Sequence, residues 1–390
     1  MYGKSLQWLC FNQLFRSPPS IVTRTLYQNR NQYPFSPRYY RQMSSKPKTG
    51  VPHQVRTAAE PRQNRLYTVR LTHIDELNPT VRLLQLTIPP NVQSLENDTQ
   101  DGDEDKTPQP LTFLPGQWLD VHIPTIPNAG GFSITSTPAD ANVLPIPEQP
   151  PKEHFDSVAE PGLPPVDSAG RPPYVELAVQ KALSNPASAW LWKPKDEILG
   201  AELGIRVGGG FVWPPSGIDL NDVRNVGLIA GGVGINPLIS ILSHLNNNES
   251  NTVLPNPTNI QILYSTRLPK PTPSSTEATL DQILFLTRLR QITQSQCQSH
   301  RLRIGLDLFI TDLPEDSPLR TAPPVDISIH ARRISREDLS VAVRGADASI
   351  KPEETVCYLC GPPEMTDEFV GVLRGLLGDG QERILFEKWW

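Results

Sequence analysis

Cysteines and long hydrophobic runs are both scarce in this chain of 390 residues. The four cysteines (Cys10, Cys297, Cys357 and Cys360) are too few for the disulfide framework that holds small secreted domains together. No hydrophobic run approaches the ~20 residues needed to cross a bilayer, so we expect no transmembrane segment. The low cysteine content is consistent with a reducing compartment such as the mitochondrial matrix.

Ligands for a structural metal ion are also lacking. Cys357 and Cys360 form a C-x-x-C pair, but no second pair and no histidine cluster accompanies it, as a tetrahedral zinc site would require. If this segment is a strand, the two side chains point to opposite faces, because they are three positions apart. We therefore predict no metal site, and we favour a buried strand over a thiol-redox pair.

Acidic residues are absent from the first 59 positions, which contain nine lysines or arginines. The net charge of the whole chain is −5, so the remainder is markedly acidic. A basic, acid-free leader is typical of an organelle transit peptide, and its apolar residues are too scattered for a secretory signal. We predict a disordered mitochondrial transit peptide over residues 1–45; the alternative is a basic tail that binds nucleic acid. The acidic remainder argues against nucleic acid as the main partner.

Proline is abundant, with 42 residues in the chain, about twice the usual ~5%. The prolines cluster at residues 89–115, 138–173, 255–273 and 314–324, which we interpret as surface insertions between structural elements.

The segments between these insertions differ in the two halves of the chain. In the first half we expect one helix at residues 186–192 and short alternating strands at residues 66–72, 81–88, 117–123, 131–136, 174–180 and 203–207. In the second half we expect strands at 226–230, 260–264, 304–310 and 355–359, and helices at 237–245, 280–292, 336–343 and 363–377. This order predicts an antiparallel β-barrel followed by an α/β domain with a parallel sheet, with a boundary near residues 214–221.

A glycine loop, Gly231-Gly232-Val233-Gly234-Ile235-Asn236-Pro237, connects the buried run 225–230 to the helix expected next. Its glycines allow the backbone to approach a pyrophosphate without a clashing Cβ, and the helix start attracts an anion. The loop differs from the dinucleotide fingerprint G-x-G-x-x-G, and no acidic residue follows at the usual distance to bind a ribose. A tight turn without a ligand is therefore the alternative.

A second segment of this kind, Cys360-Gly361-Pro362-Pro363, ends the apolar run 354–359 and precedes an amphipathic helix. Ligands of open α/β sheets bind outside the carboxyl ends of the strands. We therefore expect the glycine loop and this segment to bind one dinucleotide across the same edge.

Five segments follow one another in an order that resembles the ferredoxin–NADP reductase superfamily. They are Pro115-Gly116-Gln117, Phe132-Ser133-Ile134-Thr135-Ser136, Val207-Gly208-Gly209-Gly210-Phe211, the glycine loop and Cys360-Gly361-Pro362-Pro363. The resemblance covers about residues 62–390, and the ending Phe386-Glu387-Lys388-Trp389-Trp390 is most similar to a mitochondrial branch of the superfamily. It implies a flavin-binding β-barrel at residues 62–215 and an NAD(P)-binding α/β domain at residues 222–390.

The resemblance also implies roles for residues of the barrel. Phe132 takes the position that lies against the flavin ring, and Ser133 takes that of a hydroxyl near its reactive edge. Ile134, Thr135 and Ser188 belong to the segments that contact the flavin. The implied cofactors are NAD or NADP together with FAD, with FMN as an alternative. Without the resemblance, Phe132 and Ser133 would be interpreted as alternating buried and exposed strand residues.

In the second half, the resemblance places Cys360 opposite the nicotinamide, in a turn shaped by Gly361 and Pro362. Arg267 is a candidate for binding the 2′-phosphate of NADP, but an arginine after a strand is equally often a solvated surface charge. NADH and NADPH both remain open.

The chain end supplies two further candidates. By the resemblance, Trp389-Trp390, with Trp390 as the terminal aromatic, could cap the flavin ring, and Glu387 could relay a proton. The alternative is that the two tryptophans pack the chain end against the barrel. The candidate catalytic residues are Ser133, Cys360 and Glu387.

One departure from the superfamily pattern concerns the flavin phosphate. Gly130 stands where the pattern has an arginine, and it offers neither charge nor a guanidinium fork. Lys181 could substitute as a point charge, and Ala187-Ser188 could offer a helix start. The resemblance implies hydride transfer between NAD(P)H and a flavin, with electrons passed to an unknown, separate acceptor. The competing hypothesis is a flavin-free NAD(P)H sensor or assembly factor.

Overall fold

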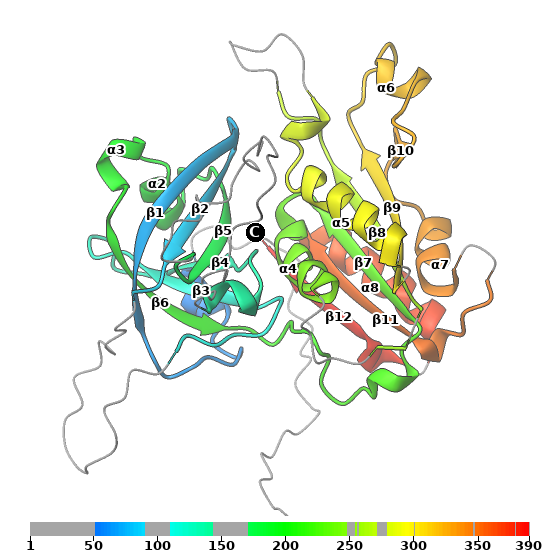
Figure 1. The fold of residues 1–390 in the computed structure, drawn as a ribbon, viewed down its shortest axis with the longest axis horizontal. Helices are drawn as coiled ribbons and strands as arrows, with labels where there is room; N and C mark the ends of the chain where they lie inside the picture. Colours follow the sequence, from blue (N-terminus) through cyan, green and yellow to red (C-terminus); the bar gives the residue numbers. More distant parts are fainter. Residues whose placement is uncertain are drawn as a thin grey trace, which may run out of the picture. The chain divides into compact units, whose positions relative to one another are not determined.

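Two six-stranded sheets, one antiparallel and one parallel, organise the described part of the chain (Figure 1). The computed structural model describes residues 51–89, 110–142, 171–247, 254–255, 257–270, 279–299, 301–345, 348–378 and 380–389. These residues belong to one compact unit. The predicted transit peptide and Trp390 lie outside the described residues, and the domain limits 62–215 and 222–390 stay predictions.

The antiparallel sheet contains the first six strands, in the order β4-β3-β6-β1-β2-β5. Their bounds are β1 (Tyr67–Asn78), β2 (Val81–Thr87), β3 (Trp118–His122), β4 (Gly130–Ser133), β5 (Tyr174–Gln180) and β6 (Glu202–Gly208). A bridge between Ile134 and Leu177 joins the two ends of the sheet, so that it closes into a barrel. Alternate residues point inward: Leu203, Ile205 and Val207 of β6 are at most 1% exposed and belong to one core cluster. The helices α1 (His53–Arg56), α2 (Pro186–Leu191) and α3 (Lys195–Ile198) are short.

The parallel sheet has the strand order β10-β9-β8-β7-β11-β12. Its strands are β7 (Asn225–Gly231), β8 (Thr258–Thr266), β9 (Leu302–Ile310), β10 (Ser328–His330), β11 (Thr355–Gly361) and β12 (Ile384–Lys388). Every residue of β7 and β11 is buried, as expected for strands covered on both faces. The fold class predicted from the sequence is therefore confirmed.

Helices cover both faces of the parallel sheet. One hydrophobic cluster joins the sheet to α4 (Ile235–Asn246) and α5 (Leu286–Ser299), and another joins it to α7 (Arg336–Arg344) and α8 (Pro363–Leu377). Cys360 belongs to the first cluster and Cys357 to the second, so the two side chains point to opposite faces as predicted. The remaining short elements are η1 (Pro138–Ala141), η2 (Leu220–Asp222), η3 (Gly232–Gly234), η4 (Leu280–Gln282), α6 (Pro318–Thr321), η5 (Pro352–Glu354) and η6 (Gln381–Arg383).

The predicted helix at 280–292 is the largest local error. The structure has the turn η4 first, and α5 begins only at Leu286. Phe285 has a φ of 59°, a left-handed conformation that a right-handed helix cannot continue through. The strands β10 and β12 were not predicted.

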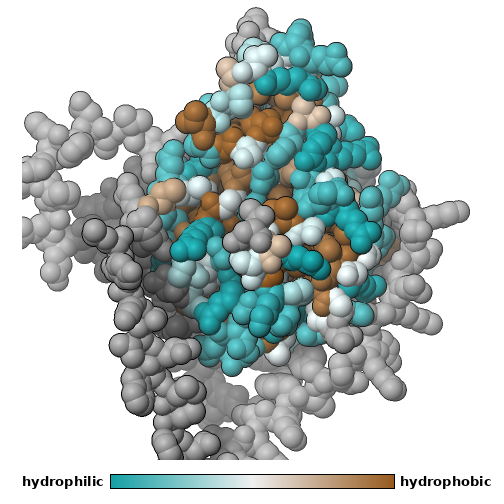
Figure 2. Space-filling model, turned by 90° about the vertical axis from the view of Figure 1, so that its right-hand side faces the viewer, coloured by the Kyte–Doolittle hydropathy of each residue, from teal (hydrophilic) through white to brown (hydrophobic). Residues whose placement is uncertain are grey.

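The two halves of the compact unit are joined by several hydrogen bonds. Asn236 Nδ2 donates to the carbonyl oxygen of Ala178 (2.9 Å), and Tyr358 OH donates to that of Val212 (2.7 Å). The surface drawn in Figure 2 mixes hydrophilic residues with separate hydrophobic patches. Among the described helices, none combines the length and hydrophobicity needed to cross a membrane.

Candidate functional site

The glycine loop and the second strand tip lie side by side. β7 and β11 are parallel neighbours, and Ala230 is in register with Cys360. A Cβ atom on Gly234 would collide with the carbonyl oxygen of Cys360, and one on Gly231 would lie 2.8 Å from Pro362 Cδ. Only glycine therefore allows this close approach of the loop to β11. The structure brings together the two segments that the sequence placed at one sheet edge.

The open side of the loop is at Gly232, whose φ is +56° and whose added Cβ would meet no atom within 4 Å. Val233 is partly buried and packs against the core, whereas Ile235 and Pro237 are buried in the first turn of α4. Asn236 is 6% exposed, and its amide holds the barrel through Ala178. No side chain caps α4 or the turn η3 (Gly232–Gly234) that runs directly into it. The Ile235 N–H group already donates to the carbonyl oxygens of Gly232 and Val233, so an anion would meet the N–H groups of the loop itself.

Cys360 and Glu387 are in register on the neighbouring strands β11 and β12. Burial raises the pKa of the Cys360 thiol well above its ordinary value, and the nearby Glu387 carboxylate adds to the rise. The thiol is therefore neutral, which disfavours a nucleophilic or redox role.

Glu387 is partly buried, and burial raises the pKa of its carboxyl group from the ordinary 4.5 to about 8. Its Oε2 accepts a hydrogen bond from Trp389 Nε1 (3.1 Å), which opposes the rise, and the charge of Glu60 adds to it. At neutral pH this carboxyl group mostly keeps its proton. It can therefore hold a proton next to the buried Cys360 thiol.

On the barrel side, Ser133 is buried and lies opposite Trp118 in the pairing of β3 with β4. Phe132 is partly buried and packs against the barrel core. Ile134 is fully buried in that core, and Thr135 Oγ1 donates a hydrogen bond to Glu176 Oε1 (2.7 Å). The side chains of Ile134 and Thr135 are thus engaged within the protein.

The groups expected near a flavin phosphate also have partners within the protein. Ser188 Oγ donates to the carbonyl oxygen of Gln180 (2.9 Å), and the backbone N–H groups of Ala187 and Ser188 donate to Asn185 Oδ1 (3.1 and 3.2 Å). The Lys181 ammonium lies over the ring of Trp192, 4.9 Å from its centroid. Among these groups only the exposed Lys181 ammonium, which contacts a ring face and has no hydrogen bond or ion pair with a described residue, is available to a flavin phosphate.

Gly130 has no room for a side chain. A Cβ atom there would lie 2.5 Å from Ala187 Cβ and 2.6 Å from Cε2 of Phe132. The close packing of β4 against α2 therefore leaves no space at Gly130 for the arginine of the superfamily pattern.

His53, which the sequence did not single out, lies in this part of the molecule. Its ring occupies the space above Gly131, where any Cβ would collide with it. It meets Trp118 edge-on with ring centroids 4.6 Å apart and lies nearly parallel to Trp389 at 6.2 Å. Burial lowers the pKa of His53 from 6.5 to about 4, so the ring is neutral at pH 7.

The carboxylate of Asp120, completely buried, lies beside His53. Its Oδ2 accepts hydrogen bonds from Arg62 Nε (2.9 Å) and Arg206 Nη2 (2.9 Å), and its Oδ1 is 3.4 Å from His53 Nε2. His53 Nε2, Asp120 Oδ1 and Trp118 Nε1 are all buried without a hydrogen-bond partner. In the sequence, this cluster is indicated only by Asp120, a charged residue within the strand Trp118–His122.

The fit to the two cofactors differs. The loop around Gly232 and the uncapped start of α4 fit a dinucleotide phosphate. On the barrel side, Trp118, opposite Ser133, has a buried Nε1 donor without a hydrogen-bond partner, whereas the N–H groups at the start of α2 are already bonded. Arg267 is exposed, one residue beyond β8, and the next backbone N–H, of Leu268, donates to Asp312 Oδ1 (2.9 Å). Among the described residues no group of three or more metal-binding side chains is found.

Comparisons with known proteins give consistent results. No protein-family model matches the chain. The chain is 30% identical over 342 residues to oxidoreductase NAD-binding domain-containing protein 1 of Danio rerio, which covers 87% of this chain and 97% of that protein. The Homo sapiens protein of the same name is 28% identical over 359 residues, covering 89% of this chain and 87% of the relative.

Solved structures of low identity share the fold. The CS-b5R domains of human Ncb5or in the NAD+ form match with a TM-score of 0.52 and 14% identity, over 84% of this chain and 70% of that one. A ferredoxin NADP+ reductase from Neisseria gonorrhoeae with bound FAD and NADP matches with a TM-score of 0.50 and 15% identity, over 84% and 99%.

Proposed function

Because this chain belongs to the family of oxidoreductase NAD-binding domain-containing protein 1, we propose that it transfers hydride between NAD(P)H and a bound flavin. The electrons then pass to a separate acceptor. The observation that carries the proposal is the close approach of Gly234 to Cys360, which joins the glycine loop and the second strand tip at one sheet edge.

In this proposal the chain binds and orients the two rings. The loop Gly231–Gly234 and the start of α4 hold the pyrophosphate through backbone N–H groups. The exposed Pro362, supported by the buried Cys360 and Gly361, would form the wall beside the nicotinamide. A bound flavin would supply the hydride chemistry, which amino-acid side chains do not provide.

On the barrel side, Phe132 and Ser133 would hold the ring of a bound flavin, and the neutral Glu387 would hold a proton beside it. Trp389, stacked near His53, helps to keep water from this region. The neutral Cys360 thiol contributes shape rather than charge. The solved structures named above, with FAD and NADP or with NAD+, support the cofactor pair.

The test is a visible spectrum of the purified protein mixed with FAD or FMN, followed by dye reduction with NADH or NADPH. We expect flavin absorbance to stay with the protein and dye reduction to require both cofactors. A Gly234→Ala variant should lose the reduction, whereas the helix variant Gly371→Ala should keep it. A protein that never retains flavin and reduces no dye contradicts the proposal.

A second function is favoured by the crowding at Gly130 and by the Asn185 cap on α2. Both leave the flavin phosphate without a ready partner, so the protein could bind NAD(P)H alone as a sensor or assembly factor. In that case NAD(P)H raises the melting temperature and flavin does not. Stoichiometric flavin in the purified protein excludes this function.

For the location of the protein we propose the mitochondrion, from the acid-free basic leader. Residues 1–59 fused to a fluorescent protein should direct it to mitochondria. Replacing the basic residues of the leader with glutamine should abolish this targeting. Diffuse fluorescence of the unmodified fusion contradicts the proposal.

A further inference from the structure

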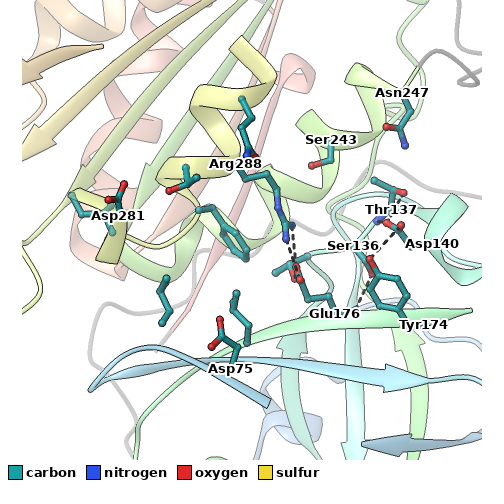
Figure 3. Close-up of a pocket in the computed structure, with 17 residues that line it drawn as sticks. Asp75, Ser136, Thr137, Asp140, Tyr174, Glu176, Ser243, Asn247, Asp281 and Arg288 are labelled. Atoms are coloured by element: carbon teal, nitrogen blue, oxygen red, sulfur yellow. Dashed lines mark hydrogen bonds and ion pairs between the residues drawn. The ribbon is translucent and has the colours of Figure 1, made fainter. Parts of the chain in front are cut away.

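A cavity of about 740 Å³ lies toward the far end of α4 from the glycine loop (Figure 3). Ser243 and Asn247 line it, and Ser243 lies roughly 12 Å along the helix from Ile235, at 1.5 Å per residue. Neither the glycine loop nor Cys360-Gly361-Pro362 contributes to the lining. The cavity is therefore separate from the proposed dinucleotide site.

One wall of the cavity is polar and buried. Thr135, Ser136, Thr137, Tyr174 and Glu176 line it, and each is at most 6% exposed. The Thr135 hydroxyl donates a hydrogen bond to the Glu176 carboxylate. The Glu176 backbone N–H in turn donates one to the Ser136 hydroxyl. Such a wall is arranged before any ligand arrives, which lowers the entropy cost of binding.

The cavity carries an excess of negative charge. Arg288 is the only lining cation among the described residues, and its Nη1 and Nη2 both donate to Glu176, at 3.0 and 3.1 Å. Asp140 is paired with Arg171 at 2.8 Å. The two other lining carboxylates have no hydrogen bond or ion pair with a described residue: Asp75 is partly buried, and Asp281 is exposed and interacts electrostatically with Arg290.

These two carboxylates lie at one end of the cavity. Figure 3 shows Asp75 and Asp281 on one side of the Arg288–Glu176 pair, with Thr137 and Tyr174 on the other. A cation at the acidic end would be attracted by both carboxylates. An anion would be repelled, because the Nη groups of Arg288 are already engaged.

An apolar surface accompanies the charge. Leu77, Leu83, Ile283 and Phe285 line the cavity. Phe285 holds a left-handed backbone conformation, with a φ of 59°, and its ring lies 4.8 Å from the Arg288 guanidinium. Non-glycine residues adopt this conformation at a cost of about 1–2 kcal/mol, and they cluster at binding sites.

We propose that this cavity binds a small organic cation, an amine attached to an apolar body. Its ammonium group lies between Asp75 and Asp281, and its apolar part rests on Leu77, Leu83 and Phe285. The volume falls within the range of about 300–1,000 Å³ that is usual for small-molecule sites. The lining comes from barrel strands and from α4 and α5, so such a ligand stabilises the contact between the two halves of the unit.

The test uses the full chain without nucleotide or flavin, so that it is independent of the proposed function. Phenethylamine and tryptamine are titrated by calorimetry and by thermal unfolding, with phenethyl alcohol and phenylacetate as matched neutral and anionic probes. We expect the amines to bind and raise the melting temperature, and the two controls to bind at least tenfold more weakly. Equal binding of the alcohol or of phenylacetate, or no binding of either amine, overturns the proposal.

Variants locate the binding. Asp75→Asn combined with Asp281→Asn should weaken amine binding at least tenfold, whereas Asp196→Asn, an exposed aspartate on α3, should not change it. Should the double variant be unstable, Leu83→Phe, which fills part of the cavity, provides a second test with the same expected loss. Unchanged binding in either variant places the amine elsewhere and overturns the assignment.

Discussion

The starts of α4 and α2 can be compared directly, because both follow a turn and both were predicted to face a phosphate. No side chain caps the turn η3 (Gly232–Gly234) or α4, which continues from it. At α2, by contrast, the side chain of Asn185 accepts hydrogen bonds from the N–H groups of Ala187 and Ser188. Capping satisfies the N–H groups that a phosphate would otherwise bind. The backbone N–H groups before α4 are therefore available to an anion, whereas the first N–H groups of α2 are occupied by the side chain of Asn185.

The largest effect is expected at the nucleotide edge. Gly234→Ala places a Cβ against the carbonyl oxygen of Cys360, so the loop and β11 must separate. We expect a loss of about 3 kcal/mol in unfolding free energy, at the upper end of overpacking effects, together with loss of NAD(P)H binding. Urea unfolding and NADH fluorescence titration measure both quantities.

The matched control is Gly371→Ala in α8, where an added Cβ meets no atom within 4 Å. There alanine should leave binding unchanged and stabilise the helix by about 0.5–1 kcal/mol. If Gly234→Ala binds NADH with normal affinity, the close contact of Gly234 with Cys360 is not required for nucleotide binding.

The buried His53 gives the next largest effect, and it appears only in acid. Its pKa is about 4 in the folded protein and about 6.5 when unfolded, so unfolding takes up a proton between these values. The stability contributed by the neutral ring is complete above pH 6.5 and falls as the pH is lowered to 4, by about 3 kcal/mol. His53→Gln should remove this part of the pH dependence.

Chemical unfolding between pH 4 and pH 7 measures it, with the exposed His73→Gln as the control. A His53→Gln variant whose stability falls with pH as steeply as that of the original protein would show that His53 is not held neutral.

Glu387 should produce the opposite pH dependence. Its folded pKa of about 8 lies above the ordinary 4.5, so unfolding releases a proton between these values. The contribution of the protonated carboxyl group is complete below pH 4.5 and is lost as the pH rises through 8. Because Glu387 is only partly buried, we expect an effect of about 1–2 kcal/mol rather than the full value of the shift.

Glu387→Gln should therefore gain stability relative to the original protein as the pH rises from 5 to 8. Unfolding free energies at these two pH values measure the gain, and Glu382→Gln, an exposed neighbour in the sequence, serves as the control. An equal difference at both pH values would mean that the Glu387 carboxyl group is already ionised at pH 5.

The parts of this structure that sequence reasoning predicted depend on local rules. Gly231 ends a buried strand and Gly234 follows it. At such a position the lack of a Cβ indicates a close approach of the backbone to another segment or to a ligand. The alternating strands of the barrel and the fully apolar run of β7 are likewise periodic patterns that one segment carries by itself.

The parts that were missed depend on contacts between distant segments. His53 reaches Trp118 and Trp389 across the fold, and nothing near position 53 in the sequence indicates either contact. β12 is a short strand at the edge of the sheet, and it is extended because it pairs with β11, a contact that its own sequence does not indicate. The late start of α5 follows from the left-handed Phe285, a conformation that composition does not reveal.

The smallest effect concerns the capped helix α2. Asn185→Ala removes the acceptor for two backbone N–H groups, and we expect a loss of about 1 kcal/mol, whereas Asn185→Asp, an equally good cap, should cost little. The freed N–H groups are those that the sequence assigned to the flavin phosphate. FAD should therefore recover part of the lost stability in Asn185→Ala, and riboflavin, which lacks a phosphate, should not. Thermal unfolding with each compound measures the recovery. If FAD does not recover any of the stability lost in Asn185→Ala, the start of α2 does not bind the flavin phosphate. The N–H groups at the start of α2 then serve only the stability of the helix, whereas those before α4 serve ligand binding.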